Sequence, residues 1–159
     1  MERKTQKNTA KTLIIAIFAL FAVLAVICGL FLVLFNMNGF ILKGFETDFE
    51  ETVKAEGYEI LETKSVYGKL NGNGNGINYF SAVLIKADEN EIEALEEALE
   101  EKHEISGYYK QEGLEIATVY NEHAPLEYET ALNESETYYT VYVFESHISG
   151  SNPLDPKGH

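Results

Sequence analysis

A long uncharged stretch near the N-terminus is the clearest pattern of hydrophobic and polar positions in the chain. Residues 13–35, 23 in all, include no charged side chain. At about 1.5 Å of rise per residue, a helix of this length matches a hydrocarbon core of about 30 Å. We therefore predict an uncleaved transmembrane helix over residues 12–35. A cleaved signal peptide is the main alternative. It is disfavoured because the stretch is longer than the apolar core of a typical signal peptide. The cleavage site is also poor, because bulky Ile27 stands where a small residue is required. The same residue argues against a lipoprotein signal, which would be cleaved just before Cys28.

The charges that flank the stretch predict its orientation. Four basic residues precede it, and only Lys43 and Lys54 follow within about 20 residues, the range over which the bias counts. We therefore expect a cytoplasmic basic N-terminus at residues 1–11 and an extracytoplasmic domain after the span. This places the protein in the cell membrane as a single-pass protein.

Beyond the span, the pattern changes to short amphipathic elements. Residues 36–43 are predicted to be a juxtamembrane linker that begins with Asn-Met-Asn-Gly. Apolar residues then recur at spacings of three and four, typical of a helix, as far as Val53, and Gly57 is a plausible stop. Thr47 and Glu50 form a capping-box pattern, so the helix is expected to restart at Thr47.

The middle of the chain predicts a hairpin and a second helix. Residues 58–67 and 78–87 read as strands on either side of the Asn-Gly run at 71–76, and the second is apolar on both faces, as expected of a central strand. Asp88 and Glu91 are spaced to cap a helix. Its buried stripe is predicted to comprise Ile92, Leu95 and Leu99.

The C-terminal third predicts further strands. A hairpin around Glu112-Gly113 is predicted, with strands at residues 108–111 and 114–120. A final strand with alternating side chains is predicted at residues 137–146. The tail, residues 149–159, is expected to be disordered. The order of elements predicts an α+β domain over residues 44–148, with a mainly antiparallel sheet of four to five strands and two helices on one face. A strand–helix–strand step also suggests a ferredoxin-like arrangement.

Charge and cysteine content narrow the function classes. The formal net charge is −14, and the segment beyond the span carries eight basic and 25 acidic residues, a net of −17. A surface of this sign repels nucleic acid, so we expect no nucleic-acid partner. The single cysteine, Cys28, lies in the span, which leaves the predicted domain without disulfides or thiol chemistry.

One group of residues resembles part of a metal site, and the histidines do not have the close spacing of one. Asn71, Asn73, Asn75 and Gly76 are spaced like the front half of a calcium loop, but Ala82 occupies the position that needs a bidentate Glu, so a flexible loop is the favoured interpretation. His103, His123, His147 and His159 are widely separated along the chain.

A zinc site built from His123, Glu122 and Glu127 after folding is a weak alternative. Carboxylates are so numerous that no pair stands out as catalytic, and the Glu-rich face at 89–101 is most simply a solvated helix surface. The sequence therefore assigns no catalytic, cofactor-binding or metal-binding residue and no cofactor.

An N-terminal membrane helix that leads into an α+β domain resembles type IV pilins and pseudopilins in layout. Those proteins carry a Gly-Phe-type processing site before the span and a Glu near the start of the mature chain. Here Asn8-Thr9-Ala10-Lys11 precedes the span, and no acidic residue lies between Lys11 and Phe45. The resemblance covers the layout alone, and it implies an assembly subunit.

These observations predict a non-enzymatic binding or accessory module of an envelope complex. The alternatives are a membrane-anchored enzyme with an unrecognised active site and a pilin-like assembly subunit. The expected partners are the membrane and another membrane or envelope protein, while the oligomeric state stays open.

Overall fold

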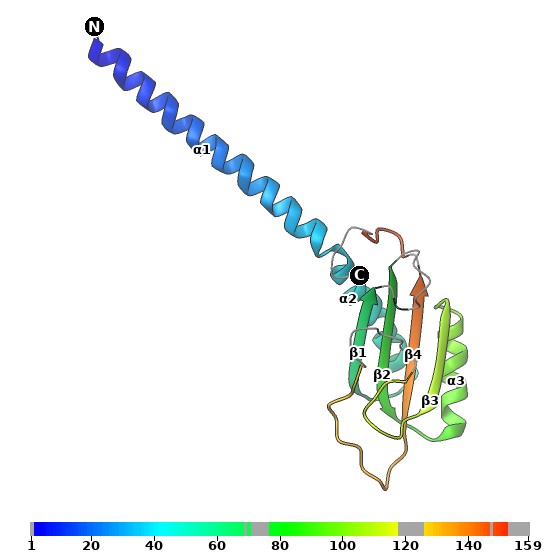
Figure 1. Ribbon diagram of the computed structural model, residues 1–159. Coiled ribbons are helices and arrows are strands. Elements are labelled where there is room, and N and C mark those ends of the chain that lie inside the picture. The colour runs from blue at the N-terminus through cyan, green and yellow to red at the C-terminus, as the bar shows by residue number, and fades with distance from the viewer. Residues whose placement is uncertain (1, 69, 71–76, 118–125, 147, 153–159) are drawn as a thin grey trace. The chain divides into compact units, whose positions relative to one another are not determined.

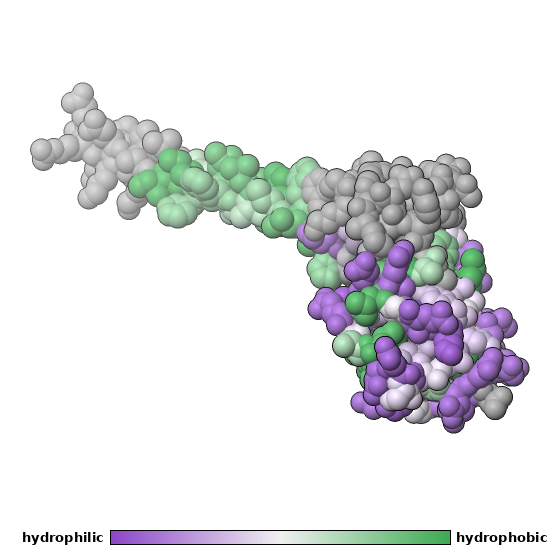
Figure 2. Space-filling view, turned by 60° about the horizontal axis from the view of Figure 1, so that its bottom comes forward, coloured by the Kyte–Doolittle hydropathy of each residue, from purple (hydrophilic) through white to green (hydrophobic). Residues whose placement is uncertain are grey.

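The computed structural model describes residues 2–68, 70, 77–117, 126–146 and 148–152, which fall into two compact units, residues 1–36 and 37–159. The first unit is α1 (Glu2–Phe35) (Figure 1). Its segment Ile14–Leu34 has a mean hydropathy of 3.1 and buries none of its side chains. By length and composition α1 can cross a membrane, and Figure 2 shows apolar side chains along this segment. The helix is therefore consistent with a single-pass anchor.

The second unit begins with α2 (Met37–Ala55), earlier than the sequence predicted. Residues 37–43, predicted as a linker, are helical, and Thr47 lies inside the helix, where its hydroxyl donates to the Lys43 carbonyl at 2.8 Å. The expected restart at Thr47 is therefore wrong. The helix begins early because its first turn contains Asn38, whose buried side chain is hydrogen-bonded to the rest of the domain. After Ala55 the chain turns at Gly57, which has a positive φ of 92°.

Four strands form one antiparallel sheet: β1 (Ile60–Gly68), β2 (Asn78–Lys86), β3 (Ile105–Lys110) and β4 (Tyr138–Ser146). Their order is β1-β2-β4-β3, with α3 (Glu89–Glu100) between β2 and β3 along the chain (Figure 1). The α+β fold and the central position of β2 are confirmed. Because β2 and β3 both run antiparallel to β4, which lies between them, β2, α3 and β3 form a split β-α-β unit. This unit suggests a ferredoxin-like sheet, although here a helix and a strand precede it.

The predicted hairpin around Glu112-Gly113 is wrong. β3 pairs with β4, from Ile105 opposite Phe144 to Lys110 opposite Tyr139. The segment after it instead makes an isolated bridge between Glu115 and Glu127, and residues 118–120 lie outside the described part of the chain.

Both helices pack on one face of the sheet, as predicted. Phe49 and Val53 of α2 share a buried cluster with the α3 stripe and with the β2 and β4 side chains of this face. The stripe is Ile92, Leu95 and Leu99, all fully buried or nearly so. The α3 cap also agrees with the sequence, because the Glu91 carboxylate accepts a long hydrogen bond, 3.4 Å, from the Asp88 N–H.

The opposite face of the sheet is covered by irregular chain. Residues 111–117 and 126–137, which we call the covering segment, contribute Ile116 and Tyr128 to a second buried cluster with Phe80 and Leu84 of β2. The sheet therefore carries apolar side chains on both faces, which explains the two-sided pattern of β2.

The chain after β4 returns to the start of α2. The Asn152 N–H donates to the Asn38 side-chain oxygen at 2.7 Å, and the Asn38 amide nitrogen donates to the Asn152 carbonyl at 2.9 Å. Residues 148–152 are therefore part of the domain, and the prediction placed the start of the tail, at residue 149, too early in the chain. Residues 153–159 lie outside the described range.

Candidate functional site

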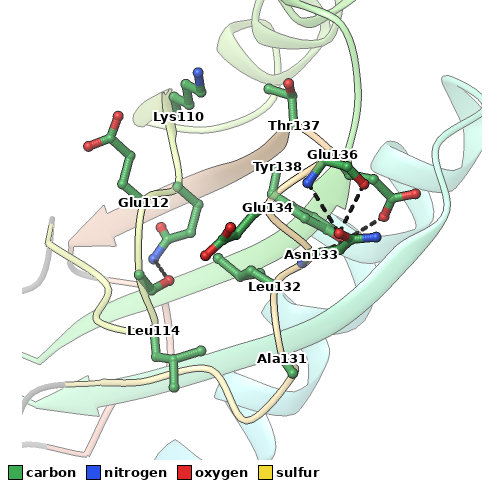
Figure 3. A pocket seen from close by; sticks show the side chains of 13 residues that line it. Lys110, Glu112, Leu114, Ala131, Leu132, Asn133, Glu134, Glu136, Thr137 and Tyr138 are labelled. Carbon is green, nitrogen blue, oxygen red and sulfur yellow. Dashed lines mark hydrogen bonds between the residues drawn. The ribbon is translucent and has the colours of Figure 1, made fainter.

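An open cleft lies at the end of the sheet where β3 ends and β4 begins. Its volume is about 630 Å³, and its walls are residues 110–114, which leave β3, and residues 131–138, which lead into β4. Figure 3 shows Leu114 on one wall and Leu132 on the other, with the Glu134 side chain extending between the two walls. Both walls belong mainly to the covering segment.

The first wall is held by the buried side chain of Gln111. Its amide nitrogen donates to the carbonyls of Gly113, at 2.7 Å, and Glu115, at 2.9 Å. Its oxygen accepts from the Thr140 hydroxyl of β4 at 2.6 Å. One side chain thus fixes a turn that has no regular secondary structure, and it attaches the turn to the sheet.

The second wall is held by a tight turn and by Tyr138. The Asn133 side-chain oxygen accepts from the Ser135 N–H and hydroxyl at 3.1 and 2.9 Å, an Asx turn. The Tyr138 hydroxyl donates to Glu136 at 2.6 Å, and Lys86 of β2 donates to the same carboxylate at 2.5 Å. The hydrogen bond from Lys86, followed by that from Tyr138, lowers the pKa of Glu136.

Glu62 of β1 attaches the covering segment to the edge of the sheet. Its carboxylate accepts from the Glu129 N–H at 2.9 Å and the Thr130 N–H at 2.8 Å, and it lies 3.0 Å from the Lys64 ammonium. Partial burial acts to raise the pKa of Glu62, but the hydrogen bonds from Glu129, Lys64 and Thr130 outweigh it and lower the pKa to about 2. Glu62 is therefore ionised at neutral pH and holds the chain just before the second wall.

The cleft combines apolar surface with two exposed carboxylates. Leu114, which is 44% exposed, and the half-buried Leu132 supply apolar surface. Glu112 and Glu134 are exposed, and neither takes part in an ion pair among the described residues, whereas Glu136 is matched by Lys86. This arrangement suits a ligand that carries positive charge beside apolar groups.

The residues considered from sequence lie elsewhere. The buried His103 follows α3, its Nδ1 is 3.0 Å from the Glu145 carboxylate, and it meets the rings of Phe45 and Phe49 edge to face. This position joins both helices to β4, so the role of His103 in the described structure is packing. Ala82 is buried in the middle of β2, and Glu127 forms the bridge to Glu115.

The remaining candidates are not described. The Asn-Gly run at 71–76 lies outside the described ranges, as do Glu122, His123, His147 and His159. Within the described ranges, no group of three His, Cys, Asp or Glu side chains could hold a metal ion. On the Glu-rich face of α3, partial burial and the neighbouring Glu100 and Glu93 raise the pKa of Glu96.

Sequence reasoning missed the cleft because its walls have no periodicity. The one local signal was the Asn133-Glu134-Ser135 run, which is typical of an Asx turn. The role of Gln111 has no local signal, because its partner Thr140 lies 29 residues further along the chain.

Comparison of the chain with protein-family models found no match. Comparisons with curated proteins and with solved structures found none either.

Proposed function

We propose that this protein is a single-pass membrane protein whose extracytoplasmic domain is a non-enzymatic binding module. In this proposal, the cleft receives a segment of another envelope protein that carries Lys or Arg beside apolar side chains. The observation that carries the proposal is the pair of exposed carboxylates, Glu112 and Glu134, which form no ion pair with another described residue. They lie on a cleft whose walls are already fixed by internal hydrogen bonds.

The anchor and its orientation rest on two features. α1 is long and apolar enough to span, and four basic residues precede its apolar part. Protease added to intact protoplasts should therefore remove the domain and leave a small membrane stub. Full protection of the domain would mean that the orientation is reversed.

The position of the cleft within the domain supports recognition of a partner. Tyr79, near the start of β2, donates to Asn38 in the first turn of α2, whereas Lys86, at the end of β2, pairs with Tyr138 of the cleft. These two positions are seven steps apart along the strand, about 23 Å at about 3.3 Å per residue. The cleft thus opens at the end of the sheet opposite to the end where the chain enters from α1.

The chemistry of the cleft favours binding over catalysis. Gln111, Asn133 and Tyr138 are the polar groups best fixed in its walls, and the hydrogen bonds described above already engage them in holding these walls. The exposed Glu112 and Glu134 remain to contact a ligand. Exposed carboxylates attract and orient a cationic partner, and apolar surface between them adds affinity through burial.

Site-specific cross-linking tests this proposal. A photo-reactive residue at position 132 of the full-length protein, purified in mild detergent after irradiation, should capture a protein segment that contains Lys or Arg. The double variant E112Q/E134Q should lose this product. The control E93Q/E97Q, which removes the same charge from exposed positions of α3, should retain it.

Two results would contradict the proposal. Capture of the same segment by E112Q/E134Q would show that the carboxylates are not used. A cross-linked segment rich in acidic residues would show that the cleft recognises a different chemistry.

A further inference from the structure

The first turn of α2 exposes a large apolar side chain. Phe40 is 68% exposed, the most exposed large hydrophobic residue in the described part of the domain. The other large hydrophobic residues exposed in that part are Leu61, Ile105 and Leu114, all less than half exposed. An aromatic ring held in water at this position gains nothing from the packing of the domain.

This turn is held rigidly to the domain. Asn38 is fully buried, and its side chain makes three hydrogen bonds, two with Asn152 and one from the Tyr79 hydroxyl at 3.1 Å. The Tyr79 hydroxyl is also 2.9 Å from the Ser151 hydroxyl. Phe40, two residues further on, therefore has a fixed place on the surface of the domain.

The length of chain between the predicted span and Phe40 is short. Phe40 is six positions after Leu34, the last residue of the apolar segment. Six steps extend about 9 Å if helical and at most about 20 Å if fully extended. The polar headgroup layer adds about 5–7 Å on each side of the hydrocarbon core. Phe40 is therefore within reach of this layer.

The charge of the first turns of α2 does not oppose contact with lipid. From Met37 to Gly44 the only charged residue is Lys43, and it pairs with Glu46. At the same end of the sheet, the Glu104 carboxylate accepts hydrogen bonds from Ser146, and the Glu145 carboxylate lies 3.0 Å from the His103 Nδ1; both belong to other segments of the domain.

We propose that the first turn of α2 docks into the lipid headgroup layer, with the Phe40 ring inserted at the boundary of the acyl chains. The proposal rests on the membrane anchor proposed above. Aromatic side chains at such boundaries bury apolar surface without entering the hydrocarbon core fully. The rigid attachment of Asn38 then fixes the distance between the domain and the bilayer.

Tryptophan fluorescence tests this docking, because the chain contains no tryptophan. The variants F40W, L114W and F21W would each be placed in phosphatidylcholine vesicles as full-length protein. The L114W indole reports the cleft and F21W reports the apolar segment. Quenching is then measured with phosphatidylcholine that carries a nitroxide either at the headgroup or deep in the acyl chain.

We expect the F40W emission to be blue-shifted and quenched mainly by the headgroup nitroxide. The L114W emission should stay at long wavelength without quenching, and F21W should be quenched mainly by the deep nitroxide. In the unmodified protein in a nanodisc, the headgroup nitroxide should also broaden the Phe40 ring resonances, which excludes an effect of the substitution itself.

The results separate the two proposals. An F40W emission that matches L114W, together with a quenched F21W, would overturn the docking and leave the anchor intact. Loss of quenching in F21W would overturn the anchor, and the docking with it.

Discussion

The hydrogen bonds of Glu62 lead to a prediction about the pH dependence of stability. The Glu62 side chain is only 15% exposed, and its ionised carboxylate accepts the backbone N–H groups of Glu129 and Thr130. Its pKa falls from 4.5 to about 2 on folding. Because the folded pKa is the lower one, this stabilisation is complete above about pH 5 and is lost as the pH falls towards 2.

The magnitude follows from the shift. One pKa unit corresponds to about 1.4 kcal/mol, so the shift contributes about 3 kcal/mol to the free energy of unfolding at neutral pH. A neutral glutamine at position 62 resembles the protonated carboxyl from which this contribution is counted, because both keep a neutral hydrogen-bond acceptor. We therefore expect E62Q to destabilise the domain by about 3 kcal/mol at pH 7 and by almost nothing near pH 2.

Urea unfolding of the fragment 37–159, followed by circular dichroism across this pH range, measures the difference. The control is E129Q, which removes a charge from the same cluster. The Glu129 side chain is 88% exposed and pairs with Lys64 at the surface, so its loss should cost no more than about 1 kcal/mol. A difference between wild type and E62Q that stayed constant with pH would refute the assignment of the stabilisation to the ionised carboxylate.

Two further predictions concern packing. In G107A, the added methyl group would lie 2.6 Å from the Tyr142 hydroxyl oxygen and 2.8 Å from its ring carbon Cζ, so we expect the free energy of unfolding in urea to fall by about 1–3 kcal/mol. The control G113A, whose methyl group would meet nothing within 4 Å, should change it little. Equal effects would show that Tyr142 moves aside freely. A fragment that begins at residue 44 should unfold at a lower urea concentration than one that begins at residue 37, because it lacks the hydrogen bonds of Asn38. Equal midpoints of unfolding would mean that the first turn of α2 adds no stability.

Elements whose signals are local could be predicted from the sequence. The apolar stripe of α3 repeats at helical spacing, and Asp88 with Glu91 marks its start, so both its bounds and its buried face follow from neighbouring residues. The same holds for β4, where Tyr139, Val141 and Val143 face the helices and the alternate side chains face the covering segment. Each of these patterns is complete within about ten residues.

The errors arise where the deciding partner is distant in sequence. Asn-Met-Asn-Gly reads locally as a break, but Asn38 is helical because it binds Asn152, 114 residues away. Glu112-Gly113 reads as a hairpin turn, yet a turn signal cannot specify that β3 pairs with β4 instead of the segment that follows it. The cleft depends on the same kind of contact, since Glu62 holds Glu129 across 67 residues.

The two faces of the sheet are covered in different ways, and this difference explains where a binding cleft can form. A helix satisfies its own backbone groups, so α2 and α3 contribute mainly apolar side chains to the sheet. Irregular chain must find other partners for its backbone, and here Gln111 and Glu62 supply them. Side chains used in this way cannot also contact a ligand. The exposed Glu112 and Glu134 stand beside the fixed turns, so their substitution should alter binding without unfolding the domain.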